Sequence, residues 1–102
     1  MKKLLITVVA LALFTGAASA KTLKTGYPIC FTEKSFDELV TAIVNNDSRQ
    51  INYLEKAGLC GIISTNVEYS LLDRTWTGTA KVRVYVGNES AVAWTNLEAT
   101  QD

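Results

Sequence analysis

The stretch LEKAGLCGIIS, residues 54–64, marks the place where the chain changes from a helical pattern to an extended one. Apolar residues recur every three or four positions before it and at every second position after it. Gly58 stands where a helix commonly ends with a left-handed residue, and Leu59 can close over the last turn. Cys60 follows at once. The stretch therefore predicts that a helical half and a β half meet beside a cysteine.

Two helices are expected before this stretch. The segment SFDELVTAIVNN, residues 35–46, places five apolar residues on one helical stripe, namely Phe36, Leu39, Val40, Ile43 and Val44. Ser35 and Glu38 have the spacing of a capping box at the start of this helix. Asp47 is the expected N-cap of a second helix, whose apolar stripe is Ile51, Leu54 and Ala57. These features predict a helical hairpin over residues 33–58.

An antiparallel β-meander is expected after it, over residues 61–99. The segment TAKVRVYV, residues 79–86, directs one set of side chains to one face and a second set to the other. The first set is Ala80, Val82, Val84 and Val86, and the second is Lys81, Arg83 and Tyr85. VEYSL, residues 67–71, and SAVAWTNLE, residues 90–98, have the same alternation, and turn residues separate the three segments. The predicted fold class is α+β.

The first twenty residues have the pattern of a cleavable secretory signal. Lys2 and Lys3 precede an uncharged apolar stretch, and small residues end at Ala20. The apolar stretch is shorter than the roughly 18 to 20 residues that span a bilayer, so no membrane anchor is expected after cleavage. The prediction is a signal peptide over residues 1–20, and a single α+β domain over residues 21–102 that is periplasmic or secreted from a bacterium.

The charges of the expected mature chain are nearly balanced. Without the two lysines of the signal, eight basic and ten acidic residues are left, and they are interspersed along the sequence. Nucleic-acid binding needs a concentrated basic face that displaces counterions from phosphates. The sequence has no such segment, and this composition argues against partners that are nucleic acids or membrane surfaces.

Cys30 and Cys60 are the two cysteines of the chain. Because the two expected helices are similar in length, the chain enters the first and leaves the second at the same end of the hairpin, which brings these cysteines near each other. A structural disulfide is the favoured interpretation in an oxidising compartment, and a free or intermolecular thiol is the alternative. The sequence has no histidine to activate a cysteine nucleophile, and two cysteines alone are a poor metal site. No cofactor or metal is expected.

Two sets of side chains could carry function. Trp76, Lys81, Arg83 and Tyr85 put aromatic rings beside cations, a combination common at recognition surfaces. Trp94 is expected mainly in the core. Acid–base chemistry would depend on carboxylates, and the candidates are Asp37, Glu38, Asp73 and Glu98. A hydrolase of this kind needs two acids that flank a cleft, which a domain of this size hardly provides.

Residues 61–97 resemble a bacterial SH3-like domain. The matching segments are NVEYSLLD at 66–73, KVRVYV at 81–86 and AWTNL at 93–97. The whole mature chain looks like small exported proteins in which a disulfide-tied helical hairpin precedes such strands. The resemblance implies a small SH3-like β-meander or barrel and a non-catalytic module that binds peptidoglycan, peptides or partner proteins.

The sequence thus predicts a small exported protein that binds a protein or cell-wall component and is not an enzyme. Two other functions stay open. The first is an inhibitor or immunity protein of a cell-wall hydrolase or other secreted enzyme, which would act through the loop DRTWTG at 73–78. The second is a small carboxylate-dependent hydrolase.

Overall fold

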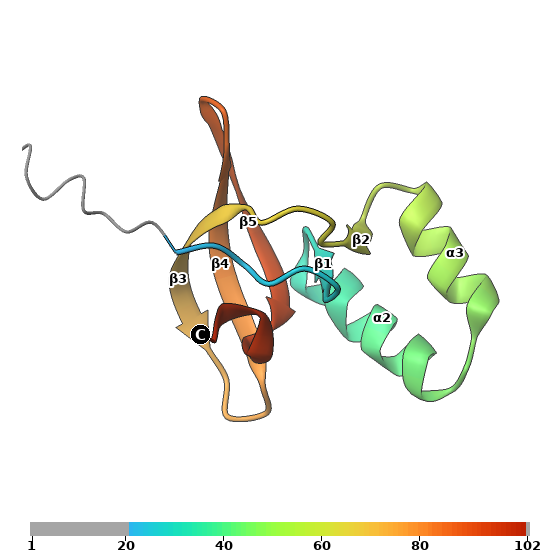
Figure 1. Cartoon of the computed structure of the whole chain (residues 1–102). Coiled ribbons are helices and arrows are strands. Elements are labelled where there is room, and N and C mark those ends of the chain that lie inside the picture. The colour runs from blue at the N-terminus through green and yellow to red at the C-terminus, as the bar shows by residue number, and fades with distance from the viewer. Residues whose placement is uncertain (1–20, 102) are drawn as a thin grey trace, which may run out of the picture.

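The computed structural model describes residues 21–101, so the expected signal peptide lies outside the described residues. Two helices and five strands confirm the α+β class (Figure 1). In chain order they are β1 (Pro28–Cys30), α2 (Glu33–Val44), α3 (Ser48–Lys56), β2 (Cys60–Ile62), β3 (Glu68–Arg74), β4 (Thr79–Val86), β5 (Glu89–Asn96) and the 3-10 helix η1 (Leu97–Thr100).

The five strands form one antiparallel sheet in the order β2-β1-β5-β4-β3. The expected meander is present in β3, β4 and β5, which pair as chain neighbours. The short strand β1 was not predicted, because PIC is too brief to show an alternation and because Pro28 is unfavourable in a central strand. β1 nevertheless lies between β5 and β2 and joins the two halves of the chain.

The sheet is open, so of the expected meander or barrel the meander is present and the closed barrel is not. Closure would require β2 to pair with β3, the two strands at its edges. Instead, the chain between them crosses one face of the sheet, where Ile63 and Val67 join the core. β2 is also only three residues long, which leaves little backbone to close a barrel.

We call the face of the sheet that carries Ala80, Val82 and Val84 the inner face. These three residues are buried with Ala93, Leu23, Ile63 and Ala99 in one apolar cluster. The segment before β1 and the 3-10 helix η1 cover this face, and the hydroxyl of Tyr69 donates to the carbonyl of Thr100 at 2.9 Å. Val86 was expected on the same face and is exposed, because it lies at the end of the hairpin, beyond the covering segments.

The two helices lie at the β1–β2 end of the sheet (Figure 1). They pack over the opposite, outer face in a second apolar cluster, made by Cys30, Phe36, Leu39, Leu54 and Cys60. The half-buried Trp94 of β5 packs against this cluster. The outer face of β4 lies beyond the helices.

The first helix begins earlier than the sequence suggested. Its N-cap is Thr32, whose hydroxyl oxygen accepts from the backbone N–H of Ser35 at 3.0 Å. The predicted Ser35–Glu38 capping box is therefore wrong, since Ser35 is already inside the helix and is buried. Asp47 caps α3 as predicted and accepts from the N–H of Gln50 at 3.1 Å.

The predicted apolar stripe of α2 is only partly buried. Phe36 and Leu39 are in the core, but Val40, Ile43 and Val44 are exposed. The helices contact the sheet mainly at β1, β2 and β5 rather than at β3 or β4, so these side chains in the C-terminal half of α2 have no strand to cover them. No helix within residues 21–101 is long and apolar enough to cross a membrane.

Candidate functional site

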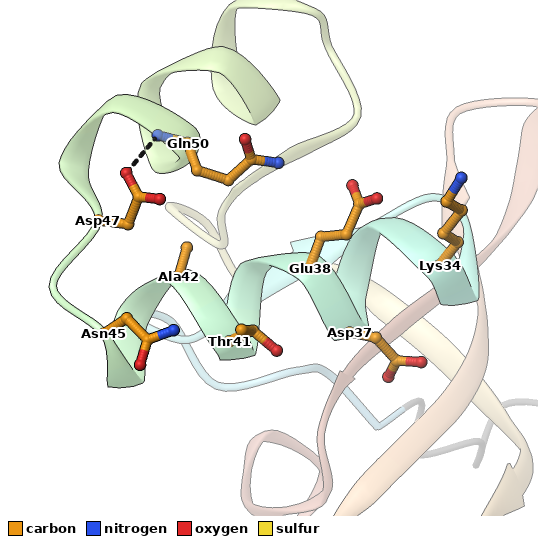
Figure 2. Close-up of a pocket in the computed structure, with 8 residues that line it drawn as sticks. All are labelled: Lys34, Asp37, Glu38, Thr41, Ala42, Asn45, Asp47 and Gln50. Carbon is orange, nitrogen blue, oxygen red and sulfur yellow. Dashed lines mark hydrogen bonds between the residues drawn. The ribbon is translucent and has the colours of Figure 1, made fainter.

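The groove between α2 and α3 contains several carboxylates. Figure 2 shows its lining, in which the Glu38 side chain is directed toward α3 whereas Asp37 is directed to the other side of α2. Asp47 also lines the groove, but its carboxylate already caps α3. The two adjacent acids of α2 therefore do not converge on one point. Within residues 21–101, no group of three or more His, Cys, Asp and Glu residues could hold a metal ion.

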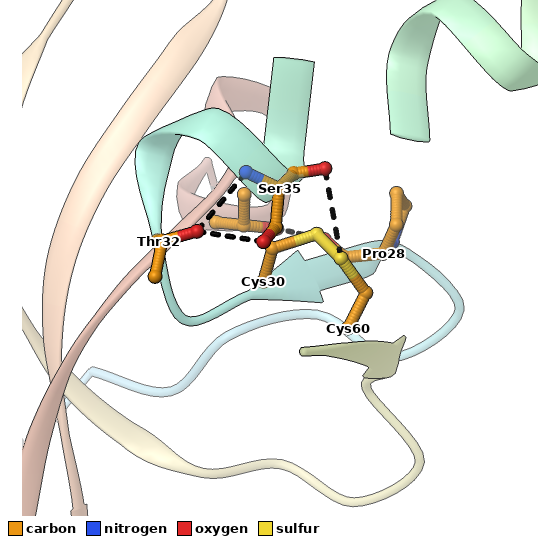
Figure 3. Close-up of a disulfide and its surroundings, with 6 residues drawn as sticks. Pro28, Cys30, Thr32, Ser35 and Cys60 are labelled. Atoms are coloured by element: carbon orange, nitrogen blue, oxygen red, sulfur yellow. Dashed lines mark hydrogen bonds between the residues drawn. A yellow bond between two sulfur atoms is a disulfide. The ribbon is translucent and has the colours of Figure 1, made fainter. Parts of the chain in front are cut away.

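Cys30 and Cys60 form a disulfide, as predicted, and face each other across β1 and β2 with their α-carbons 4.0 Å apart (Figure 3). Both are buried. The Cys60 sulfur lies 3.8 Å from the Ser35 carbonyl oxygen, a contact and not a hydrogen bond because a disulfide sulfur carries no hydrogen. This bond ties the strand before the helices to the strand after them.

The outer face of β4 carries Lys81, Arg83 and Tyr85 at alternate positions. Tyr85 is 38% exposed, and the two basic residues are half-buried. The Tyr85 hydroxyl is hydrogen-bonded to the hydroxyl of Ser70 on β3 at 2.9 Å, which orients the ring. Three of the four predicted recognition residues thus share one strand face.

Trp76 lies at the tip of the turn between β3 and β4, and its side chain is 96% exposed. The turn is closed by a backbone bond from the Thr75 N–H to the Thr79 carbonyl and by a second bond from the Thr79 N–H to the Thr75 hydroxyl. Gly78 has a φ of +100°, which suits glycine. The backbone that presents the indole is therefore well defined.

Trp76 does not lie in one compact patch with the other three residues. Lys81 is two residues beyond Thr79 and lies near the turn. Tyr85 is six residues beyond Thr79, or roughly 20 Å along an extended strand. The candidate surface is therefore a band along β4 that begins at Trp76.

A hollow of about 150 Å³ lies beside this turn, at the start of the band. Trp94 forms one wall, and the Lys81 Nζ is over its ring, 5.6 Å from the centroid. The rest of the lining comes from β3, β4, the turn and the N-terminus of α2: Glu33, Asp73, Arg74, Thr75 and Thr79. We call this site the Trp94 hollow.

The sequence analysis singled out Lys81 and the loop that contains Asp73, Arg74 and Thr75, but it did not place Glu33, Thr79 and Trp94 at a site. Asp73 was a candidate acid, and the pairing of Asp73 with Lys81 could have been found from the hairpin register around TWTG. The place of Glu33 in the hollow could not have been predicted in this way, because only the packing of α2 on β5 brings Glu33 to the hollow. The other candidate acids lie elsewhere, Asp37 and Glu38 on α2 and Glu98 on η1.

Comparison of the chain with protein-family models, curated proteins and solved structures finds no match. The class that the fold defines is a small disulfide-linked α+β domain with an open antiparallel sheet. The disulfide, the two helices and the antiparallel strands are compatible with the SH3-like resemblance, and no family assignment supports it further.

Proposed function

We propose that this protein is a small exported binding protein of the bacterial cell envelope, periplasmic or secreted, that recognises a protein or a cell-wall component. The recognition surface comprises Trp76, Lys81, Arg83 and Tyr85. The exposure of Trp76 supports this proposal most directly, because an almost fully exposed indole gains nothing for the fold. Tryptophan and arginine are also enriched among residues that dominate binding energies.

The geometry of the turn supports the same function. Its hydrogen bonds restrict the backbone around Trp76, so little backbone entropy is lost when a partner binds. The SH3-like resemblance of residues 61–97 is in keeping with a non-catalytic module. The buried disulfide is in keeping with an oxidising compartment, and the expected export signal leads to a mature protein that begins at Lys21.

The test is capture of partners by the mature protein, residues 21–102, with envelope proteins and purified peptidoglycan as separate arms. Trp76→Ala is expected to reduce capture by about tenfold or more in one arm, as at a binding hot spot. The matched control is Tyr53→Ala, which removes an exposed aromatic residue of α3 that does not belong to the proposed recognition surface. Equal capture by the wild type and both variants would refute the proposed surface.

An inhibitor of a secreted enzyme is the second candidate function, and the Trp76 turn is the observation that favours it. An inhibitor commonly inserts a rigid, exposed loop into the cleft of its target, and residues 73–78 form such a turn. The wild type would then lower the activity of a cell-wall hydrolase in a titration, and Trp76→Ala would not. Full hydrolase activity at saturating wild-type protein excludes the tested enzyme as a target.

A carboxylate-dependent hydrolase could use the two acids that line the Trp94 hollow, Glu33 and Asp73. Hydrolysis there would release reducing ends from a glycan and would stop in Asp73→Asn, because one acid of the pair is lost. The binding proposal predicts no release from the wild-type protein. A reducing-end assay on peptidoglycan separates the two functions.

A further inference from the structure

The Trp94 ring is a fixed apolar wall. Trp94 pairs with Cys30 on one side and Lys81 on the other, so its backbone is held between two strands. Its side chain packs against the apolar cluster that contains the disulfide. A ring held in this way loses little freedom when a ligand contacts it.

The face of the Trp94 ring, and not its edge, is directed toward Lys81. The Lys81 ammonium lies over the ring, 5.6 Å from the centroid, which is the geometry of a cation–aromatic contact. Lys81 also lines the hollow, so its flexible side chain can move aside or donate to a bound group. The hollow thus combines a flat apolar surface with a mobile donor.

The charged lining of the hollow is balanced. Glu33 and Asp73 supply acceptors, and Arg74 and Lys81 supply donors. A strongly anionic ligand would meet two carboxylates and a strongly cationic ligand would meet two cations. The ligand that fits is neutral and offers donors and acceptors together, with an apolar face for the ring.

We propose that the Trp94 hollow binds one unit of a neutral saccharide. A pyranose ring has an apolar C–H face that can stack on Trp94, and each of its hydroxyls both donates and accepts. This inference rests on the proposed function, because Lys81 belongs to the recognition surface as well. If the protein recognises a cell-wall component, the inference identifies that component as a glycan. A volume of about 150 Å³ suits a single sugar unit, and the rest of a chain would extend from the hollow over the surface.

The test follows the fluorescence of Trp94 in a Trp76→Phe variant, because the chain has two tryptophans and this change leaves one. The probes are a neutral N-acetylglucosamine trimer, the cationic glucosamine trimer and an anionic galacturonate trimer. The neutral trimer is expected to give a saturable change and to bind more tightly than either charged trimer. No saturable change, or equal or tighter binding of a charged trimer, overturns the inference.

A variant of the hollow provides the second measurement. Asp73→Asn retains the oxygen that accepts from the Arg74 N–H at 2.8 Å and removes the charge. It is expected to weaken binding of the neutral trimer about tenfold, as for one charge-assisted hydrogen bond. Asp37→Asn, on an exposed face of α2, is the control and leaves the affinity unchanged. Equal losses in both variants overturn the assignment of Asp73.

The saccharide site and the Trp76 recognition surface can fail independently in these experiments. If Trp76→Ala abolishes partner capture but the neutral trimer does not bind, only the saccharide site fails. If the neutral trimer binds and Asp73→Asn weakens it, while Trp76→Ala captures partners as the wild type does, the Trp76 surface fails and the hollow stands.

Discussion

Gly58 ends α3 with a φ of +75°, in the left-handed region. The N–H of Gly58 donates to the Glu55 carbonyl and that of Leu59 donates to the Leu54 carbonyl, which is the Schellman arrangement. Asn46 ends α2 in the same way, with a φ of 54°, and the Asp47 N–H reaches the Ala42 carbonyl. Single residues thus stop both helices and direct the chain into the next element.

We predict that Gly58→Ala lowers the free energy of unfolding by about 1 kcal/mol, because a Cβ disfavours the left-handed conformation. The measurement is urea denaturation of the oxidised protein. Gly61→Ala is the matched control: its added Cβ also meets no atom within 4 Å, and its φ is not positive. The interpretation is wrong if the two variants are equally stable.

Residue types alone placed some residues of the candidate surfaces correctly and missed the surroundings of others. Trp76 was expected at the surface because it lies in a turn, and it is exposed. Trp94 was expected mainly in the core, and the structure shows a half-buried ring that serves both the core and a hollow. Alternation along a strand distinguishes its two faces, but it does not show that the helices cover only part of the outer one.

At the scale of elements, α2 shows how a helix start can be misassigned. Thr32 and Ser35 both suit an N-cap, and both precede the apolar stripe. The structure selects Thr32 because Phe31 still belongs to the extended chain that follows β1. The Phe31 N–H donates to the Leu59 carbonyl, and the helix begins directly after Phe31. The hydroxyl of Thr32 also donates a hydrogen bond to the hydroxyl of Ser35 at 2.6 Å.

We predict that Thr32→Ala lowers the free energy of unfolding by about 1 kcal/mol, the usual value of a lost N-cap. Ser35→Ala is expected to change it by less than about 0.5 kcal/mol, because alanine is the best helix former and the capping bond to the Ser35 N–H is retained. Chemical denaturation of both variants is the measurement. A larger loss for Ser35→Ala than for Thr32→Ala would place the cap at Ser35 after all.

At the scale of the whole molecule, two apolar clusters meet at β1 and β5. One lies on the inner face under the meander, and the other lies between the helices and the outer face and contains the disulfide. The Thr95 hydroxyl, buried between these strands, donates to the Pro28 carbonyl at 2.6 Å. The link between the helical half and the β half is therefore short and depends on β1.

We predict that the double variant Cys30→Ala/Cys60→Ala loses about 3 to 4 kcal/mol of unfolding free energy. The disulfide closes a loop with a sequence separation of 30, and the loop-entropy relation gives this value. The measurement is denaturation of the variant against the oxidised wild type, with the reduced wild type as control. Unchanged stability in the variant would show that the bond does not stabilise the fold.

The sequence by itself determined the main elements: two helices from their 3.6-residue period, the meander from its two-residue period, and the cysteine pair from its position at the ends of the hairpin. These are local properties, since side-chain direction follows from the backbone period. Only the tertiary structure decided the open sheet, the place of β1, the exposed half of the α2 stripe and the Trp94 hollow. Each of these depends on contacts between residues far apart in the chain, which periodicity does not encode.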